Sequence, residues 1–524
     1  MNLFNAAEFL VHRHMRQGIG QKTAMKGSYE RTYRQLSDDV ARLASGLRGL
    51  GLHRDERVVL VMSDDVEMAT SILAAFHAGL VAVPISTMLN GHELSEITRD
   101  AGARVVIATP EFLDAVVEAV NASPDVAHLI LVGRAASDVA LQLLRDDVAV
   151  TSWGDLFKAA EEPTVTEAAA WALWLYTSGT TGKPKAAMHR HANIRHVYET
   201  YGRQTLGIRE DDRCLSVAKM FFAYGIGNSM FFPLAAGATS ILQPARPTPQ
   251  ATGERLMAAA PTLFFAVPTF YSSLLASDLP DDAFAPVRLC VSAGEPLPEA
   301  LQLQFKRRFG VDILDGIGST EALHIFLSNS PDDIRPGTTG KPVPGYRVEI
   351  RGTDGRIVGP GKPGDLYVSG ESIALGYWRR VDANRSVFQG EWLRTGDTCL
   401  MDDQSYYHCL GRSNDLLKSG GIWVSPIEVE ARLLAHGAVA EAAVVGVPDG
   451  DAIDKPWALV VRAPSQDDVG AEDLIDWCRE GLAAFKRPRC IEFTVELPKT
   501  ATGKLQRFRV REMLYDLTRS DVSQ

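Results

Sequence analysis

The chain has 524 residues, more than a single hydrophobic core can organise, so about two to four domains are expected. Its 46% apolar and 23% charged residues are typical of a globular protein, and its formal net charge of −11 argues against non-specific nucleic-acid binding. The six cysteines form no C-x-x-C pair, so neither a zinc site nor a disulfide framework is indicated.

Strands and helices alternate in the first part of the chain. Short apolar runs predict buried strands, and apolar residues at helical spacing predict helices. This order predicts a mostly parallel sheet with helices on both faces, whose ligands bind beyond the carboxyl ends of the strands. The predicted elements are a helix over 32–52, a strand over 57–62, a helix over 67–79, and strands over 80–85, 104–108 and 128–132.

A loop rich in glycine, hydroxyl groups and lysine follows a short apolar strand at 172–175. The loop, residues 176–185, reads YTSGTTGKPK. Glycine lets the backbone approach an anion, and turned N–H groups, hydroxyls and lysines add donors and charge. The spacing is not that of a Walker loop, because Pro184 follows Lys183. Composition alone leaves a flexible surface turn as the alternative to a phosphate site.

A second alternating region begins near Asp212 and contains an aromatic, glycine-rich segment, 219–228. Its two glycines lack the third position of a dinucleotide fingerprint, so we reject that interpretation. Aromatic residues such as Phe221, Phe222 and Tyr224 more often belong to a core than to a pocket wall. The flanking glycines nevertheless favour the close approach of a flat molecule.

Two further strands lead into glycine-rich loops, at 287–296 and 313–321. An isolated acid after such a turn, as Glu321 is, usually serves as the N-terminal charge of a helix. His324 by itself would more often be a structural histidine. From about residue 342, short strands separated by Gly, Asp and Pro turns predict a small antiparallel or barrel-like subdomain.

The last part of the chain predicts a separate α+β unit. Strands are expected over 441–447 and 458–461, and a helix over about 472–484. Gly503 gives freedom to the loop that carries Lys504, whereas a solvated surface suits most of the other basic residues between 486 and 511.

Three strings, at 176–185, 411–421 and 497–504, resemble the signature segments of the adenylate-forming superfamily and follow its order. That superfamily contains acyl- and aryl-CoA ligases, luciferases and peptide-synthetase adenylation domains. The resemblance covers essentially the whole chain, which looks most like benzoate-CoA ligases. Two positions depart from the usual pattern. Ala186 stands where the family usually has glycine, and alanine would be tolerated there if its φ is negative. The family usually has two consecutive aspartates where this chain has Asn414 and Asp415.

The resemblance implies an α/β multidomain fold. A large N-terminal domain, 1–414, would contain two doubly wound α/β subdomains and a small β-barrel-like subdomain. A small α+β C-terminal domain, 415–524, would rotate about a hinge at Asp415.

The same resemblance implies the site residues. Thr320 would contact phosphate, Glu321 would coordinate Mg²⁺, and Lys504 would be the catalytic lysine of adenylation. Lys418, Ser419, Gly420 and Gly421 would line the coenzyme A passage. The substrate pocket would comprise Phe222, Ala223, Tyr224, Gly225, Gly318, His324 and Ile325. ATP would be bound by Thr177, Ser178, Gly179, Thr180, Thr181, Lys185, Gly294, Glu295, Pro296, Asp315, Gly316, Ile317, Gly318, Asp397 and Arg412.

Two of these roles also make chemical sense from the residue types. Magnesium prefers hard oxygen ligands and usually takes one or two protein carboxylates, with phosphates and water completing its shell, which suits Glu321. A carboxylate is a good acceptor for the hydroxyls of a ribose, which suits Asp397. The alternative for Asp397 is an ordinary Gly-Asp turn.

The implied activity is ATP-dependent ligation of an aromatic carboxylate, benzoate or a substituted benzoate, to coenzyme A through an acyl-adenylate. One alternative is an adenylation enzyme that loads an aryl acid onto a carrier-protein thiol, and another is an inactive nucleotide or acyl-adenylate sensor.

We expect neither a nucleic-acid nor a membrane partner. The first twenty residues lack the long apolar run of a signal peptide, and no apolar stretch has membrane-spanning length. Together with the cysteine pattern, this favours the cytoplasm. A homodimer is left open.

Overall fold

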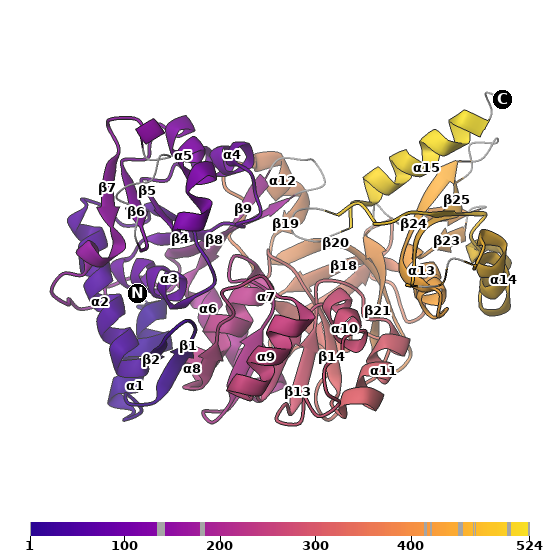
Figure 1. Ribbon diagram of the computed structural model, residues 1–524, viewed down its shortest axis with the longest axis horizontal. Coiled ribbons are helices and arrows are strands. Elements are labelled where there is room, and N and C mark those ends of the chain that lie inside the picture. Colours follow the sequence, from indigo (N-terminus) through magenta and orange to yellow (C-terminus); the bar gives the residue numbers. More distant parts are fainter. Residues whose placement is uncertain are drawn as a thin grey trace. The chain divides into compact units, whose positions relative to one another are not determined.

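The computed structural model describes residues 2–133, 142–178, 184–412, 417–419, 422–448, 454–464, 466, 468–499 and 505–521 (Figure 1). The chain forms two compact units, Met1–Val348 with Val368–Leu393, and Glu349–Tyr367 with Arg394–Gln524. The predicted domain boundary between 414 and 415 lies outside the described residues. None of the helices described is both long enough and apolar enough to cross a bilayer.

The first unit contains a seven-stranded sheet that is parallel except at one edge. Strand order is β7 (Ala149–Ser152), β6 (His128–Leu131), β5 (Val105–Ala108), β3 (Arg57–Val61), β4 (Val81–Pro84), β8 (Trp171–Ser178) and β9 (Pro184–Arg190), with only the β8–β9 pair antiparallel. Every residue of β4 and β5 is buried, so both faces of the sheet are covered. This confirms the predicted parallel α/β arrangement.

The helices around this sheet begin and end where local sequence signals place them. They are α2 (Tyr33–Gly49), α3 (Val66–Ala78), α4 (Gly91–Ala101) and α5 (Leu113–Ala122). Thr32 and Gln35 form a capping box at the start of α2. Gly79 ends α3 with a φ of 72°, a conformation that favours glycine. Apolar residues of α4 and α5 pack on the alternate residues of the strands that face them.

A nine-stranded sheet follows the same rules. Its order is β16 (Lys341–Pro342), β15 (Ile325–Ser328), β14 (Ile313–Gly318), β13 (Leu289–Ser292), β12 (Leu263–Ala266), β10 (Arg213–Ser216), β11 (Thr239–Ile241), β1 (Thr23–Lys26) and β2 (Glu30–Thr32). The strands from β14 to β1 are parallel. Buried residues of α9 (Pro249–Ala259), α10 (Pro268–Leu275) and α11 (Glu299–Phe309) pack on β12, β13 and β14. Strands β1 and β2 were not predicted from the sequence.

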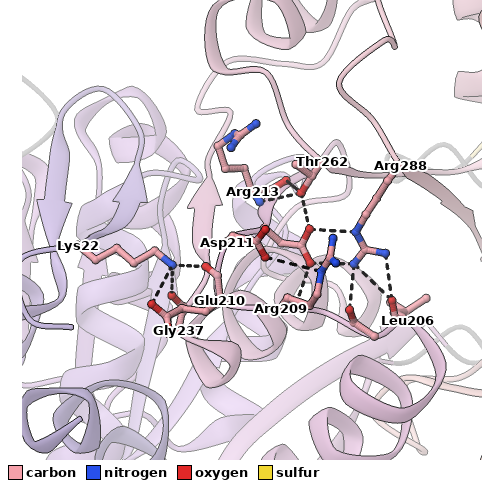
Figure 2. Close-up of polar contacts among 11 residues, drawn as sticks. Lys22, Leu206, Arg209, Glu210, Asp211, Arg213, Gly237, Thr262 and Arg288 are labelled. Atoms are coloured by element: carbon pink, nitrogen blue, oxygen red, sulfur yellow. Dashed lines mark hydrogen bonds and ion pairs between the residues drawn. The ribbon is translucent and has the colours of Figure 1, made fainter. Parts of the chain in front are cut away.

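The partly exposed Arg288 forms an ion pair with the buried Asp212, just before β10 of this second sheet (Figure 2). Arg288 donates to both oxygens of Asp212, at 3.0 and 2.7 Å, and Thr262 donates to Oδ1 at 2.7 Å. Burial pushes the Asp212 pKa upward, but the hydrogen bonds from Arg288, the Arg209 backbone and Thr262 outweigh burial, so the pKa lies below its usual value. The pair ties the segment before β10 to the residue before β13.

The rest of the first unit is made of shorter elements. They are η1 (Glu8–His12), α1 (Arg13–Arg16), η2 (Pro110–Phe112), η4 (Trp153–Leu156), α6 (His191–Val197), η5 (Tyr198–Thr205), α7 (Ala223–Ile226), η6 (Gly227–Phe231), α8 (Phe232–Ala236), α12 (Val381–Val387) and β19 (Phe388–Gln389). Strands β17 (Arg347–Arg351), β18 (Gly364–Ser369) and β20 (Trp392–Met401) each supply residues to both units. These short strands fit the predicted change of pattern after residue 342.

The second unit contains a small sheet covered on both faces. The sheet has the order β24 (Val439–Pro448), β25 (Asp454–Arg462) and β26 (Cys490–Phe493). One face packs on α13 (Pro426–Leu434) and α14 (Ala471–Gly481), and the other on α15 (Arg507–Asp521). Strands β21 (Tyr407–Arg412), β22 (Leu417–Ser419) and β23 (Ile422–Val424) and the turn η7 (Ala484–Lys486) complete it. The predicted strands at 441–447 and 458–461 and the helix near 472–484 are confirmed.

Candidate active site

The predicted phosphate loop joins β8 to β9, which pair in antiparallel fashion. Strand β8 continues through Ser178 and β9 begins at Pro184, so Thr177 stands opposite Lys185 across the two strands. Only the backbone of Ser178 is described, and Gly179, Thr180 and Thr181 lie outside the described residues. Strand pairing therefore places Thr177 and Lys185, near the two ends of the loop, opposite one another.

A tight turn between β14 and β15 carries Thr320 and Glu321. Burial lowers the pKa of His189 to about 4, so its ring is neutral, and its Nε2 donates to the Thr320 carbonyl at 2.8 Å. The Tyr377 hydroxyl donates to Glu321 Oε1 at 2.7 Å, and the Ala374 N–H donates to the Glu321 carbonyl at 2.8 Å. The turn is thus held in place by β9 and by the 374–377 segment.

The segments predicted to hold the adenosine lie at two neighbouring parallel strands, one in the loop after β13 and one within β14. Gly294, Glu295 and Pro296 form the loop after β13, where Gly294 has a φ of 91°. Asp315, Gly316, Ile317 and Gly318 belong to β14, and Asp315 is paired with Ser292 of β13. The carboxyl ends of parallel strands are where α/β folds bind ligands. The contacts of these residues with adenine remain predictions.

His324 lies inside a cage of aromatic rings. The centroid of its ring is 4.6 Å from that of Phe232, 5.3 Å from that of Tyr201 and 5.6 Å from that of Tyr224. The side chain is 2% exposed, and burial lowers its pKa to about 3, against a smaller opposing effect of the Tyr224 backbone. His324 therefore presents a neutral, flat ring, and its place in the substrate pocket stays a prediction.

Backbone geometry keeps the pocket segments close together. A Cβ on Gly318 would lie 2.5 Å from the His324 carbonyl oxygen, and one on Gly225 would lie 1.9 Å from the Lys219 carbonyl oxygen. Leu323, just before His324, has a φ of 67°, which is unusual for a residue with a branched side chain. These positions explain the glycines that the sequence places around the aromatic residues.

The other predicted pocket residues lie on the same elements. Phe222 is the N-cap of α7, Ala223 opens that helix, and Ile325 is the first residue of β15. Tyr224 donates from its hydroxyl to the Val291 carbonyl at 2.9 Å, which ties α7 to β13.

In the second unit, the residues predicted to face the nucleotide are direct neighbours. Asp397 of β20 is paired with Arg412 of β21, and Arg412 Nε lies 3.3 Å from Asp397 Oδ1. Arg412 also donates from Nη1 to the Thr395 carbonyl at 2.9 Å. Lys418 and Ser419 lie in β22, where only their backbone is described. Asp415, Gly420, Gly421 and Lys504 lie outside the described residues.

Sequence reasoning missed four residues around the candidate site: His189, Tyr201, Phe232 and Tyr377. Each reaches the site from a distant segment, and none belongs to one of the three signature strings. For Tyr377, the sequence shows only that an aromatic residue follows Gly376, and this pair of residues does not by itself indicate a functional role.

Two family models match the chain. The model described as AMP-binding enzyme matches residues 12–378, and that of the AMP-binding enzyme C-terminal domain matches residues 428–504. The chain belongs to the AMP-binding enzyme family.

Several relatives that match nearly the whole of this AMP-binding enzyme are named as ligases of aromatic acids. The benzoate–CoA ligase of Thauera aromatica is 45% identical over 97% of this chain and 96% of its own length. The 4-hydroxybenzoate–CoA/benzoate–CoA ligase of Rhodopseudomonas palustris is 42% identical over 97% of this chain and 94% of its own. The crystal structure of the anthranilate CoA ligase AuaEII with anthranoyl-AMP superposes with a TM-score of 0.92 at 38% identity, covering 99% of both chains.

Proposed function

We propose that this AMP-binding enzyme joins an aromatic carboxylate, benzoate or a substituted benzoate, to coenzyme A in an ATP-dependent reaction. The carboxylate attacks the α-phosphorus of ATP and gives an acyl-adenylate and pyrophosphate. The coenzyme A thiol then attacks the acyl carbon, and AMP leaves.

One observation carries this proposal: the same turn carries Glu321 and, three residues later, His324. Glu321 accepts a hydrogen bond from the Tyr377 hydroxyl. The ring of His324 lies among three aromatic rings. A turn that carries both a hydrogen-bonded carboxylate and a flat, neutral ring suits a reaction between a metal-bound nucleotide and an aromatic acid. The relatives named for benzoate, 4-hydroxybenzoate and anthranilate support the same class of acid.

The electrostatic problem of the first step is the approach of a carboxylate to a polyanion. Lys185 at the loop end and Lys504 would supply positive charge where negative charge accumulates. Glu321 offers one carboxylate, which fits a magnesium ion that also binds phosphate and water. When bound, Mg²⁺ would neutralise phosphate charge. The chain's own task is to position the two substrates.

The second step needs a different set of groups at the same place. We propose that the C-terminal domain rotates about Asp415, withdraws Lys504 and presents the 418–421 segment to coenzyme A. This would let one site serve both half-reactions.

The test is a panel of aryl, cinnamyl and aliphatic acids, each assayed with ATP and coenzyme A while AMP and thioester are measured together. We expect equal amounts of both products with benzoate or a substituted benzoate. AMP release and transfer only to a phosphopantetheinyl carrier protein would favour the carrier-loading alternative. Nucleotide binding without AMP formation from any acid would favour the sensor.

The cellular setting stays a prediction. All six cysteines are free, which supports a reducing compartment such as the cytoplasm. Sedimentation of the purified protein would test whether it forms a homodimer.

A further inference from the structure

Tyr377 contacts two charged residues that the sequence assigned to different parts of the site. Its hydroxyl donates to Glu321 Oε1 at 2.7 Å. The Nζ atom of Lys185 lies 5.6 Å from the centroid of the same ring. The side chain is 6% exposed, so it forms both contacts from a largely buried position.

The backbone of Tyr377 is fixed independently of these contacts. Its N–H donates to Asn384 Oδ1 at 2.6 Å, and Asn384 Nδ2 donates back to the Tyr377 carbonyl at 2.9 Å. Tyr377 also forms a bridge with Ala187 of β9, and its ring packs edge-on against Phe388 with centroids 5.2 Å apart. The phenol is therefore held in place by its surroundings.

Glu321 is tied to the same segment through its backbone. The Ala374 N–H donates to the Glu321 carbonyl, three residues before the tyrosine that binds the Glu321 side chain. The carboxylate and the backbone that carries it thus have one common support. Carboxylates that bind metals are usually oriented by such a hydrogen bond, and its loss weakens metal binding by about 10- to 100-fold.

The charges around Tyr377 suggest why a phenol stands there. Glu321 and Lys185, both among the described residues, have opposite charges but form no ion pair within 4.0 Å of one another, and each contacts Tyr377. A direct pair would use the carboxylate and the ammonium to neutralise each other. The phenol offers a hydrogen-bond donor to the first and an aromatic ring to the second.

We propose that Tyr377 is a positioning residue for the adenylation step. It orients the Glu321 carboxylate toward a nucleotide-bound divalent cation and supports Lys185, so that both charges stay available to ATP. This inference rests on the proposed function. It adds a residue that acts through Glu321 and Lys185.

The experiment measures equilibrium binding of ATP by isothermal titration, with Mg²⁺ and with EDTA, to the full-length protein. Tyr377→Phe removes only the hydroxyl, so we expect ATP binding with Mg²⁺ to weaken about 10-fold and binding with EDTA to change less than about twofold. Tyr377→Leu also removes the ring beside Lys185 and should weaken binding under both conditions. The KM for the aromatic acid should stay unchanged in Tyr377→Phe.

The matched control is Tyr33→Phe, which deletes another buried hydroxyl, one that donates to the Ala238 carbonyl at 2.7 Å. It should leave ATP binding unchanged. In a Glu321→Gln background, Tyr377→Phe should cause no further loss of the Mg²⁺-dependent part of binding, because the residue it acts through is already altered.

Three results would overturn the inference: Mg²⁺-dependent binding by Tyr377→Phe equal to that of the unmodified protein, an equal loss with EDTA, or a loss that persists in the Glu321→Gln background. If Tyr377→Phe does not fold, Asn384→Ala replaces it, since that change releases the tyrosine backbone and keeps the hydroxyl. A two- to fivefold loss confined to Mg²⁺ is then expected, and no loss overturns the inference. An unmodified protein that binds no ATP under either condition would instead overturn the proposed function.

Discussion

Asp64 accepts the backbone N–H of Met220 with both carboxylate oxygens, at 2.9 and 3.1 Å. Asp64 follows β3 of the first sheet, whereas Met220 belongs to the aromatic segment, 219–228, that follows β10 of the second. Asp64 is 5% exposed, and burial raises its pKa to about 6, opposed by the Lys219 ammonium and by the Met220 N–H. A buried acid therefore anchors the pocket segment to the neighbouring sheet.

Asp64 makes the stability of the fold depend on pH. The pKa is about 6 in the folded chain and about 4 in an unfolded one, so the native state binds the proton more tightly. The resulting stability is fully present below about pH 4 and is lost as the pH rises through 6. Asp64→Asn removes this pH dependence. At pH 7.5 its free energy of unfolding should therefore be higher than that of the unmodified protein, by at most about 3 kcal/mol.

Thermal unfolding of both proteins between about pH 4.5 and 7.5 tests this prediction. The midpoint temperatures of the two proteins should be similar at the acidic end of this range and should differ at its alkaline end. Asp64→Ala is the control, because it leaves the Met220 N–H without its acceptor and should lower the midpoint at every pH. Parallel curves for Asp64→Asn and the unmodified protein would show that Asp64 does not titrate in this range.

His324 should select the acid without taking part in proton transfer. Its pKa of about 3 keeps the ring neutral at working pH, and its neighbours are aromatic rings. His324→Ala should raise the KM for benzoate about 10- to 100-fold through the lost apolar wall and leave the shape of the pH profile of kcat/KM unchanged between pH 6 and 9. His92→Ala, at a side chain that is 79% exposed, serves as the control. Loss of a limb of the profile would mean that His324 acts as an acid or base.

The Asp212–Arg288 pair should matter for folding and not for the choice of acid (Figure 2). The Asp212 side chain is 1% exposed, so Arg288→Met would leave a buried charge without its main partner, at a cost of about 3–5 kcal/mol. Combining it with Asp212→Asn should restore much of the stability. The Arg209 side chain is 64% exposed, so Arg209→Met should lower the free energy of unfolding by less than about 1 kcal/mol. Chemical denaturation measures all three, and an Arg288→Met variant as stable as Arg209→Met would contradict this account.

The elements that carry the site were predictable because their signals are local. Buried strands such as β3, β4 and β5 are continuous apolar runs, as strands covered on both faces must be. Loops that contain glycine and acidic residues, such as the loop after β13, could be predicted for the same reason. Strand β1 was missed because Thr23–Lys26 is short and has no alternating pattern.

The contacts that complete the site depend on tertiary structure and left no local signal. Tyr377 meets Glu321 only because the 374–377 segment lies against β9, where Ala187 bridges to Tyr377. Tyr201 contacts His324 from η5, a π-helical segment. The residues of a π-helix do not follow the α-helical period on which sequence-based prediction of helices depends. Periodicity can place an element, but it does not tell which side chains of two distant elements touch.

The two half-reactions should depend on different residues, and Lys504 is assigned to the first. Lys504→Ala should lower adenylate formation by about 10²- to 10³-fold, the scale for losing one preorganised donor. Thioester formation from supplied acyl-adenylate should change little. Pyrophosphate exchange measures the first step, and near-normal exchange in this variant would exclude the role. Lys499→Ala, in the same region but paired with Glu441 at 2.5 Å, is the matched control.

Asp415 should show the opposite behaviour if the C-terminal domain turns about it. Proline fixes φ and removes the N–H, so Asp415→Pro restricts the backbone rotation that a hinge needs. Adenylate formation should be spared and thioester formation impaired, which a single-turnover experiment with separate quantification of adenylate and thioester resolves. Asp415→Ala, which keeps the backbone free, should affect neither step by more than a few-fold. Equal loss of both steps in the proline variant would argue against a hinge, because a hinge limits only the exchange between two arrangements.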